Sequence, residues 1–299
     1  MKAVTFHRTG DPTVLALDEV PELPVGLRDI RVVVTAAAVN PVDLKTRSGF
    51  LDLNLAYPAV PGWDVSGVVA ETGGEVTRFT VGEQVVGMVA QPAHRYGTYA
   101  EQVVADAGLF APAPAGLPLE EAAALPLAGL TAVQTLAKLT LPSGVPVLVT
   151  GAAGAVGRIA VQLLLAGGHP VDALARTGDA EALRDLGVGT VHTRVRDLPA
   201  ATHSAVVDTA GVAAAIRAVA DGGQFVAIDD NDQPAPERGI TPRKSYVDED
   251  GDQLRTLSEL VTAGRLTVPT GRRYPLADAA RAHQEFGAGG LRGKVLLLP

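Results

Sequence analysis

Three glycines at three-residue spacing, Gly151, Gly154 and Gly157, form the segment whose residue types most directly suggest chemistry. Without a Cβ atom, glycine lets the backbone turn tightly and approach a bulky anion such as a pyrophosphate. The segment departs from the common pattern G-x-G-x-x-G because Ala152 stands where the first glycine would be. A glycine triplet alone is also compatible with a tight turn that binds no ligand, so its interpretation depends on the flanking elements.

The flanking residues predict a strand before the glycines and a helix after them. Residues 147–149 are Val-Leu-Val, which is typical of a strand buried on both faces. In residues 156–164 apolar side chains recur every three or four positions, as on one face of a helix. The start of such a helix offers free N–H groups and a partial positive charge to an anion. This context favours a dinucleotide site made by Gly151, Ala152, Gly154, Ala155, Val156 and Gly157.

The end of the next expected strand, residues 171–175, indicates which nicotinamide cofactor is bound. An acidic residue there binds the ribose hydroxyl of NAD, whereas a cation accepts the 2′-phosphate of NADP. Arg176 and Thr177 follow the strand, and a guanidinium forms charge-assisted hydrogen bonds with phosphate. We therefore predict NADPH as the cofactor. Two alternatives stay open. A shift in register would bring Asp172 nearer the ribose, and Arg176 could equally be an exposed cation of a loop that binds no phosphate.

The composition of the 299 residues indicates a globular protein with an acidic surface. Hydrophobic residues make up 47%, charged residues 19%, and the net charge is −8. This charge disfavours nucleic acid and anionic membranes as partners, so we expect a small-molecule substrate. The sequence has no cysteine, and its six histidines show no H-x-x-x-H spacing. We therefore expect no metal site.

The N-terminal residues MKAVTFHRTG lack the apolar core of a signal peptide. The longest uncharged run, residues 139–157, is interrupted by two prolines and a glycine, which suits a loop better than a membrane span. We expect a cytoplasmic protein that does not contact membranes.

The signals for strands and helices change along the chain. Residues 1–117 contain short β-rich stretches separated by turn residues, which predicts an antiparallel, barrel-like domain. In residues 118–264 strands alternate with helices, including expected helices over 132–139 and 212–220. This alternation indicates a doubly wound parallel sheet and an α/β fold. Residues 265–299 no longer alternate, so we expect this tail to return to the first domain.

Five stretches together resemble the zinc-independent quinone oxidoreductase branch of the medium-chain dehydrogenase/reductase superfamily. They read AVNPVD at 38–43, VPGWD at 60–64, LPLAGLT at 125–131, GAAGAVG at 151–157 and GKVL at 293–296. They extend over nearly the whole chain and occur in family order. The resemblance implies a GroES-like substrate domain built from both termini, a Rossmann domain between them, and a cleft for NADPH and substrate. It also implies a homodimer that joins the edges of the nucleotide-domain sheets.

The resemblance further implies roles for individual residues. Those assigned to cofactor binding outside the glycine turn and the Arg176 position are Asn40, Thr131, Thr209, Gly211, Ile228 and Lys294. Asn40 would position the nicotinamide or the substrate. Lys45, in the pattern N-P-V-D-x-K, is the expected catalytic donor, although a solvated surface lysine is equally compatible with its sequence context.

The expected reaction is transfer of a hydride from NADPH to an electron-poor carbon of a quinone or an α,β-unsaturated carbonyl compound. The hydride leaves charge on the carbonyl oxygen, which is where Lys45 would donate. One alternative is a reductase of an enoyl thioester or another biosynthetic intermediate, with Arg243 and Lys244 as candidates for docking the substrate. Another is an NADPH-binding sensor without turnover.

Overall fold

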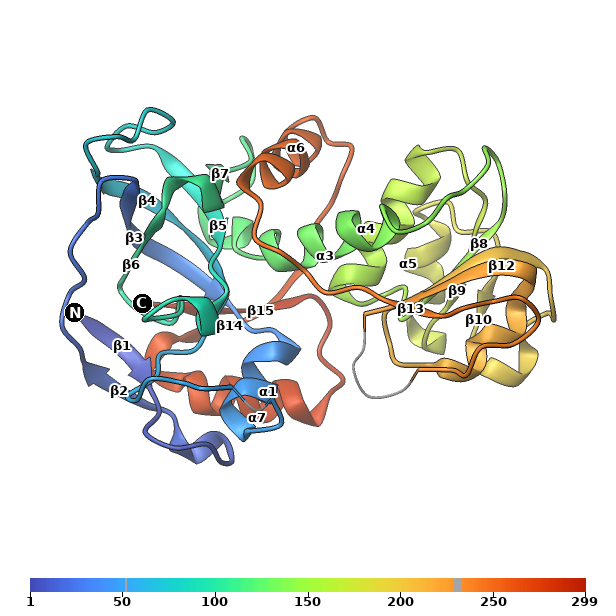
Figure 1. Ribbon diagram of the computed structural model, residues 1–299, viewed down its shortest axis with the longest axis horizontal. Helices are drawn as coiled ribbons and strands as arrows, with labels where there is room; N and C mark the ends of the chain where they lie inside the picture. Colours follow the sequence, from blue (N-terminus) through green and yellow to red (C-terminus); the bar gives the residue numbers. More distant parts are fainter. Residues whose placement is uncertain (52, 229–232) are drawn as a thin grey trace. The chain divides into compact units, whose positions relative to one another are not determined.

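The computed structural model divides the chain into two compact units (Figure 1). The structure describes residues 1–51, 53–228 and 233–299. Unit 1 comprises Met1–Leu127 together with Glu249–Pro299, and unit 2 comprises Ala128–Asp248. Both ends of the chain therefore belong to unit 1.

Unit 2 is built on a six-stranded parallel sheet with the order β10-β9-β8-β11-β12-β13. The strands are β8 (Val147–Thr150), β9 (Val171–Leu174), β10 (Val191–His192), β11 (His203–Asp208), β12 (Val219–Ala227) and β13 (Arg243–Lys244). Val147, Leu148 and Val149 of the central strand β8 are fully buried, as expected from their apolar run. The strand order reverses between β8 and β11, the place where doubly wound sheets bind ligands. This sheet confirms the predicted α/β fold.

Helical segments connect the strands of unit 2; α marks an α-helix and η a 3₁₀ helix. They are α4 (Ala155–Ala166), η4 (Thr177–Asp179), α5 (Ala180–Arg184), η5 (Val195–Asp197) and η6 (Ala213–Ala218). Helix α4 buries Ile159, Ala160 and Leu164. This is the apolar face that the sequence periodicity predicted, and it fixes α4 immediately after the glycines.

The predicted helix over residues 212–220 is wrong. The structure has the 3₁₀ helix η6, which is followed directly by β12. The Ala218 carbonyl accepts a hydrogen bond from the N–H of Thr202 at 3.0 Å, and the Arg217 carbonyl accepts one from the N–H of Ala201 at 2.9 Å. These carbonyls therefore pair with a neighbouring segment and do not continue a helix.

Unit 1 contains a seven-stranded sheet with the order β14-β15-β3-β4-β5-β7, and β6 pairs with β3. Its strands are β3 (Asp29–Ala38), β4 (Asp64–Thr72), β5 (Gln84–Met88), β6 (Gln102–Asp106), β7 (Phe110–Pro112), β14 (Thr270–Pro275) and β15 (Lys294–Leu298). A separate hairpin joins β1 (Lys2–Thr5) to β2 (Ala16–Glu19). The C-terminal strand β15 pairs with β3, so the tail of the chain completes this sheet.

Along the chain, the helices of unit 1 lie in the connections between its strands. They are η1 (Pro12–Val14), α1 (Pro41–Ser48), η2 (Gln91–Ala93), η3 (Ala107–Leu109), α2 (Leu119–Ala122), α6 (Gly251–Thr262), η7 (Leu276–Asp278) and α7 (Ala279–Ala288). Helix α3 (Pro126–Leu136) starts in unit 1 and continues into unit 2.

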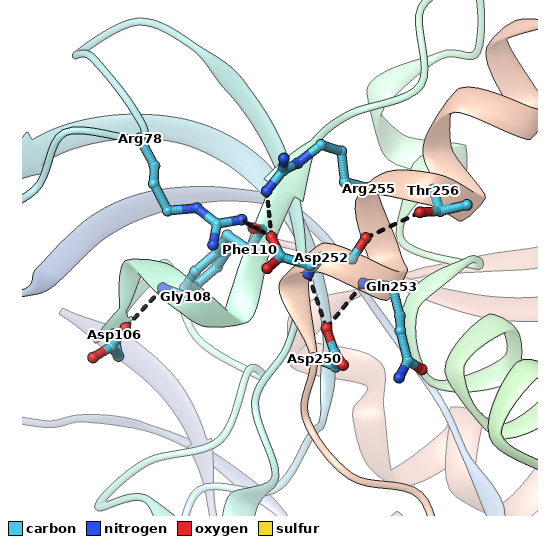
Figure 2. Close-up of polar contacts among 9 residues, drawn as sticks. All are labelled: Arg78, Asp106, Gly108, Phe110, Asp250, Asp252, Gln253, Arg255 and Thr256. Atoms are coloured by element: carbon cyan, nitrogen blue, oxygen red, sulfur yellow. Dashed lines mark hydrogen bonds and ion pairs between the residues drawn. The ribbon is translucent and has the colours of Figure 1, made fainter.

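Helix α6 belongs to unit 1, although the sequence boundaries placed it in the nucleotide-binding domain of residues 118–264. The Asp250 carboxylate caps it by accepting two N–H groups of its first turn (Figure 2). Asp252 in that turn forms an ion pair with Arg78 at 3.0 Å (Figure 2). The Ser258 hydroxyl donates to a carbonyl of β7 at 2.6 Å. These contacts attach α6 to the β7 edge of unit 1.

Candidate functional site

The glycine turn after β8 leaves no room for a side chain at two of its glycines. Gly151 has a φ of +61°, and a Cβ there would lie 2.7 Å from Thr209 Oγ1. A Cβ on Gly157 would overlap the carbonyl oxygen of Gly151. These two glycines therefore let the turn pack closely against its own neighbours, which is the role of glycine in the tight turn that precedes a pyrophosphate site.

Helix α4 begins at this turn without a capping side chain. Its N-cap is Gly154, which has extended backbone angles and makes no side-chain hydrogen bond. The first N–H groups of a helix have no partner within it, and here Ala155, Val156 and Gly157 carry them. Ala152 is fully buried beneath the turn. The uncapped N–H groups and the helix dipole together fit an anionic diphosphate.

The end of β11 lies beside the turn and brings three further predicted residues to it. Thr209 Oγ1 donates to the carbonyl of Thr150 at 2.7 Å. The buried Asp208 carboxylate accepts the Thr150 hydroxyl and two N–H groups of the bend that contains Gly211. The N–H of Ile228 donates to the Asp208 carbonyl at 3.0 Å. Thr209, Gly211 and Ile228 therefore lie at the same carboxyl edge of the sheet as the glycine turn.

The two residues weighed for cofactor choice have different environments at β9. The Asp172 carboxylate accepts the N–H of Thr190 at 2.8 Å and lies 3.0 Å from His203 Nε2. It is therefore engaged by its own neighbours. Arg176 and Thr177 lie just beyond the strand and are exposed. Arg176 is therefore an exposed cation just beyond the end of β9.

Unit 1 buries a pair of opposite charges beside Asn40. Lys294 Nζ lies 2.9 Å from Asp64 Oδ2, and the two side chains are 4% and 0% exposed. Lys294 also donates to the Asn40 side-chain oxygen, and Asn40 Nδ2 donates to Asp64 Oδ2 at 2.9 Å. The structure therefore brings Asn40 and Lys294 together across 254 positions of sequence. Sequence reasoning did not select Asp64 as a site residue, although the stretch VPGWD contained it.

Asp64 also determines where α3 begins. Its second oxygen, Oδ1, accepts the N–H of Leu127 at 2.6 Å and so satisfies a first-turn donor of the helix. The helix therefore starts well before the predicted range of 132–139. Thr131, one turn further along, is 6% exposed, and its hydroxyl has no hydrogen-bond partner among the described residues.

A second buried polar chain runs from Asp43 through Tyr99 to His283. The Tyr99 hydroxyl donates to Asp43 Oδ2 at 3.1 Å and lies 3.2 Å from His283 Nε2. Asp43 Oδ2 also accepts the N–H of Asn40 at 2.8 Å. Burial raises the pKa of Asp43 to about 7. Burial, and then the positive charge of Arg47, lower the pKa of His283 to about 3.

Comparison with known proteins agrees with this geometry. Residues 26–115 match the family model for the alcohol dehydrogenase GroES-like domain, and residues 180–297 match that for zinc-binding dehydrogenases. The whole chain is 32% identical to 2-methylene-furan-3-one reductase of Solanum lycopersicum and covers 79% of it. It is 31% identical to the chloroplastic NADPH-dependent alkenal/one oxidoreductase of Arabidopsis thaliana and covers 80% of it. The structure of the quinone oxidoreductase from Coxiella burnetii aligns with a TM-score of 0.90 at 28% identity, covering 100% of this chain and 99% of that one.

The chain belongs to the quinone oxidoreductase branch of the medium-chain dehydrogenase/reductase superfamily. This confirms the resemblance and the GroES-like and Rossmann architecture inferred from sequence. The protein is an oxidoreductase that uses a nicotinamide cofactor and a small-molecule substrate.

In this member of the quinone oxidoreductase branch, the contacts that join Asp64, Lys294 and Asn40 do not include Lys45. It is half-buried on α1, and its ammonium is 5.5 Å from the centre of the Phe50 ring. Within the described part of the chain, no carboxylate forms an ion pair with it. Phe50 is 59% exposed, so the ammonium and an aromatic face lie together near the surface of unit 1.

The second family model is named for zinc, and a zinc site needs suitable ligands. The sequence contains no cysteine. Among the residues that the structure describes, no three His, Cys, Asp or Glu side chains gather as metal ligands.

Among the described residues, no helix combines the length and apolar character needed to cross a membrane.

Proposed function

We propose that this enzyme is a zinc-free, NADPH-dependent oxidoreductase that transfers a hydride to a quinone or an α,β-unsaturated carbonyl compound. The glycine turn after β8, which leads into the uncapped start of α4, carries this proposal. The names of the relatives support both substrate classes, because one is an alkenal/one oxidoreductase and another a quinone oxidoreductase.

The bound cofactor would supply the hydride, while the protein supplies position and charge. The backbone N–H groups of the glycine turn and the first turn of α4 would hold the pyrophosphate. Thr209, Gly211 and Ile228 would line the adjacent edge of the sheet. The hydroxyl of Thr131, which has no hydrogen-bond partner among residues 1–51, 53–228 and 233–299, is a further polar group for the nicotinamide half.

The choice of NADPH over NADH is proposed from Arg176 and Thr177. Their exposed side chains would receive the 2′-phosphate, which a guanidinium binds strongly. Asp172, the residue that would favour NADH, already contacts Thr190 and His203. These contacts support recognition of phosphate at this position.

The substrate oxygen is proposed to accept a hydrogen bond from Lys45. Hydride addition to an enone leaves negative charge on that oxygen, and an un-neutralised ammonium stabilises it. Asn40 and Lys294 are held by Asp64, so we assign them to positioning the nicotinamide end.

A homodimer is proposed from the edge strand β13. It ends the six-stranded sheet, where pairing with a second copy would extend the sheet. Light scattering at several protein concentrations tests this, and a mass that stays monomeric would contradict it. The cytoplasmic location stays a prediction.

The function is tested by following NADPH oxidation with quinones, alkenals and enoyl thioesters, while NADPH binding is measured by fluorescence. We expect turnover with a quinone or an alkenal. Turnover of thioesters alone would favour the alternative substrate class. Binding without oxidation of any compound would indicate a sensor and contradict hydride transfer.

A further inference from the structure

Asp64 is the point at which four elements, α1, α3, β4 and β15, meet. Its buried carboxylate accepts Asn40 Nδ2 at 2.9 Å, Lys294 Nζ at 2.9 Å and the N–H of Leu127 at 2.6 Å. Asn40 immediately precedes α1, Lys294 begins β15, and Leu127 lies in the first turn of α3. Asp64 itself begins β4. One carboxylate thus fixes the starts of two helices and two strands.

Each of these contacts leads to a residue assigned above to the cofactor. Asn40 and Lys294 are two of them, and Leu127 is followed one helical turn later by Thr131. We propose that Asp64 is a positioning residue, which holds Asn40, Lys294 and the start of α3 in the arrangement that the nicotinamide end requires. This inference rests on the proposed function, because the three contacts matter to catalysis only if that site binds NADPH.

The charge of Asp64 is needed as well as its shape. All three of its partners are donors, and a carboxylate is a side chain that only accepts. An asparagine would turn its own N–H groups toward one of these donors. It would also remove the ion-pair partner of the buried Lys294 ammonium, which destabilises a folded protein. The test must therefore separate a loss of stability from a loss of position.

The experiment compares Asp64→Asn, Asp64→Glu and the control Ile30→Val with the wild type. Ile30 is a fully buried core residue of β3, at the opposite end of the β3–β4 pairing from Asp64. Its truncation should therefore lower stability without disturbing the contacts of Asp64. Four quantities are measured: the melting temperature, kcat, KM for NADPH, and the fluorescence of the bound nicotinamide.

We expect Asp64→Asn to lower kcat at least about tenfold, as displaced supporting residues do, while KM for NADPH changes by no more than about threefold. KM is spared because the glycine turn and Arg176 are unaltered. The emission of bound NADPH should shift toward that of free NADPH. Asp64→Glu keeps the charge, so it should recover most of the melting temperature but only part of kcat. Ile30→Val should lower the melting temperature and leave kcat unchanged.

A folded Asp64→Asn or Asp64→Glu variant with wild-type kcat and wild-type nicotinamide emission would overturn the proposal. If Asp64→Asn does not fold, kcat and nicotinamide emission of Asp64→Glu are compared with those of the wild type, and wild-type values of both would overturn the proposal. A wild type that binds NADPH but oxidises none with any substrate contradicts the proposed function. The emission of NADPH bound to Asp64→Glu still tests Asp64 in that case.

Discussion

The ammonium of Lys45 is the group placed to meet charge on a substrate oxygen, and its removal has different consequences for the two substrate classes. We predict that Lys45→Ala lowers kcat/KM for an alkenal about 10²-fold, the usual cost of losing one such donor. The loss for a quinone should be much smaller, because solvent can protonate the reduced product. Steady-state kinetics with both substrates measure the difference.

Two matched variants control this measurement. Lys45→Arg keeps a positive charge and should retain part of the alkenal activity. Lys138→Ala removes an exposed lysine of unit 2 and should have no effect. Unchanged kcat/KM for both substrates in Lys45→Ala would show that Lys45 is a solvated surface lysine without a role in the reaction.

The Arg176 guanidinium should distinguish the two nicotinamide cofactors. We predict that Arg176→Ala raises KM for NADPH at least about tenfold, because a charge-assisted contact with phosphate is lost. KM for NADH should stay within about twofold, since NADH has no such phosphate. Arg184→Ala, an exposed arginine on α5, is the control. Equal use of NADH and NADPH by the wild type would contradict the assignment.

Asp43 and His283 have pKa values displaced in opposite directions, so their effects on stability oppose each other. Burial raises the pKa of Asp43 from 3.8 to about 7, so its stabilising contribution is present below pH 3.8 and is lost as pH rises through about 7. Burial lowers the pKa of His283 from 6.5 to about 3, so its contribution is present above pH 6.5 and is lost as pH falls through about 3. Between about pH 4 and pH 6.5 the two slopes therefore cancel; the charged groups that act on them are Asp64 and Lys294 for Asp43, and Arg47 for His283.

Removing either group should expose the slope of the other. In Asp43→Asn the unfolded chain binds one proton more than the folded chain, so the free energy of unfolding should rise with pH by about 1.4 kcal/mol per pH unit relative to wild type. His283→Gln should give the opposite slope. Urea unfolding at several pH values across this range measures both. Parallel profiles for the three proteins would show that the buried chain does not titrate in this way.

At the scale of elements, the junction of β8 and α4 depends on glycine. A Cβ on Gly157 would overlap the backbone carbonyl of Gly151, whereas a Cβ on Gly287 of α7 would lie at an ordinary 3.4 Å from Leu44. We predict that Gly157→Ala lowers the melting temperature and weakens NADPH binding at least about tenfold, since the turn must shift. Gly287→Ala should raise the melting temperature slightly, as helical Gly-to-Ala changes do. Equal NADPH affinity in both variants would remove the turn from the site.

The sequence predicted those elements whose signals are local. The apolar run of β8, the glycines and the apolar face of α4 lie within one short segment, so periodicity and composition were sufficient to predict them. The start of α3 was missed because the carboxylate that fixes it, Asp64, lies 63 residues earlier. The helix expected at 212–220 was wrong because its carbonyls pair with residues 201 and 202. Partners distant in the sequence leave no periodic signal.

At the scale of the whole molecule, family resemblance supplied what local signals could not. Asn40 and Lys294 were chosen from separate motifs, and the structure places them in one buried network. Asp64, which joins them, was visible only as one residue of the stretch VPGWD, because nothing in a linear sequence shows that it accepts donors from three elements. The return of the C-terminal strand to β3 brings Lys294 into this network.

The central claim is that a hydride leaves the nicotinamide of NADPH for a quinone or an enone. The most direct test uses two samples of NADPH that carry deuterium on opposite faces of C4, and it measures the label in the oxidised nucleotide by mass spectrometry. We predict that, with a quinone and with an alkenal, one sample loses its deuterium completely and the other retains it. Equal loss from both samples, or no oxidation of the nucleotide with either substrate class, would contradict the account.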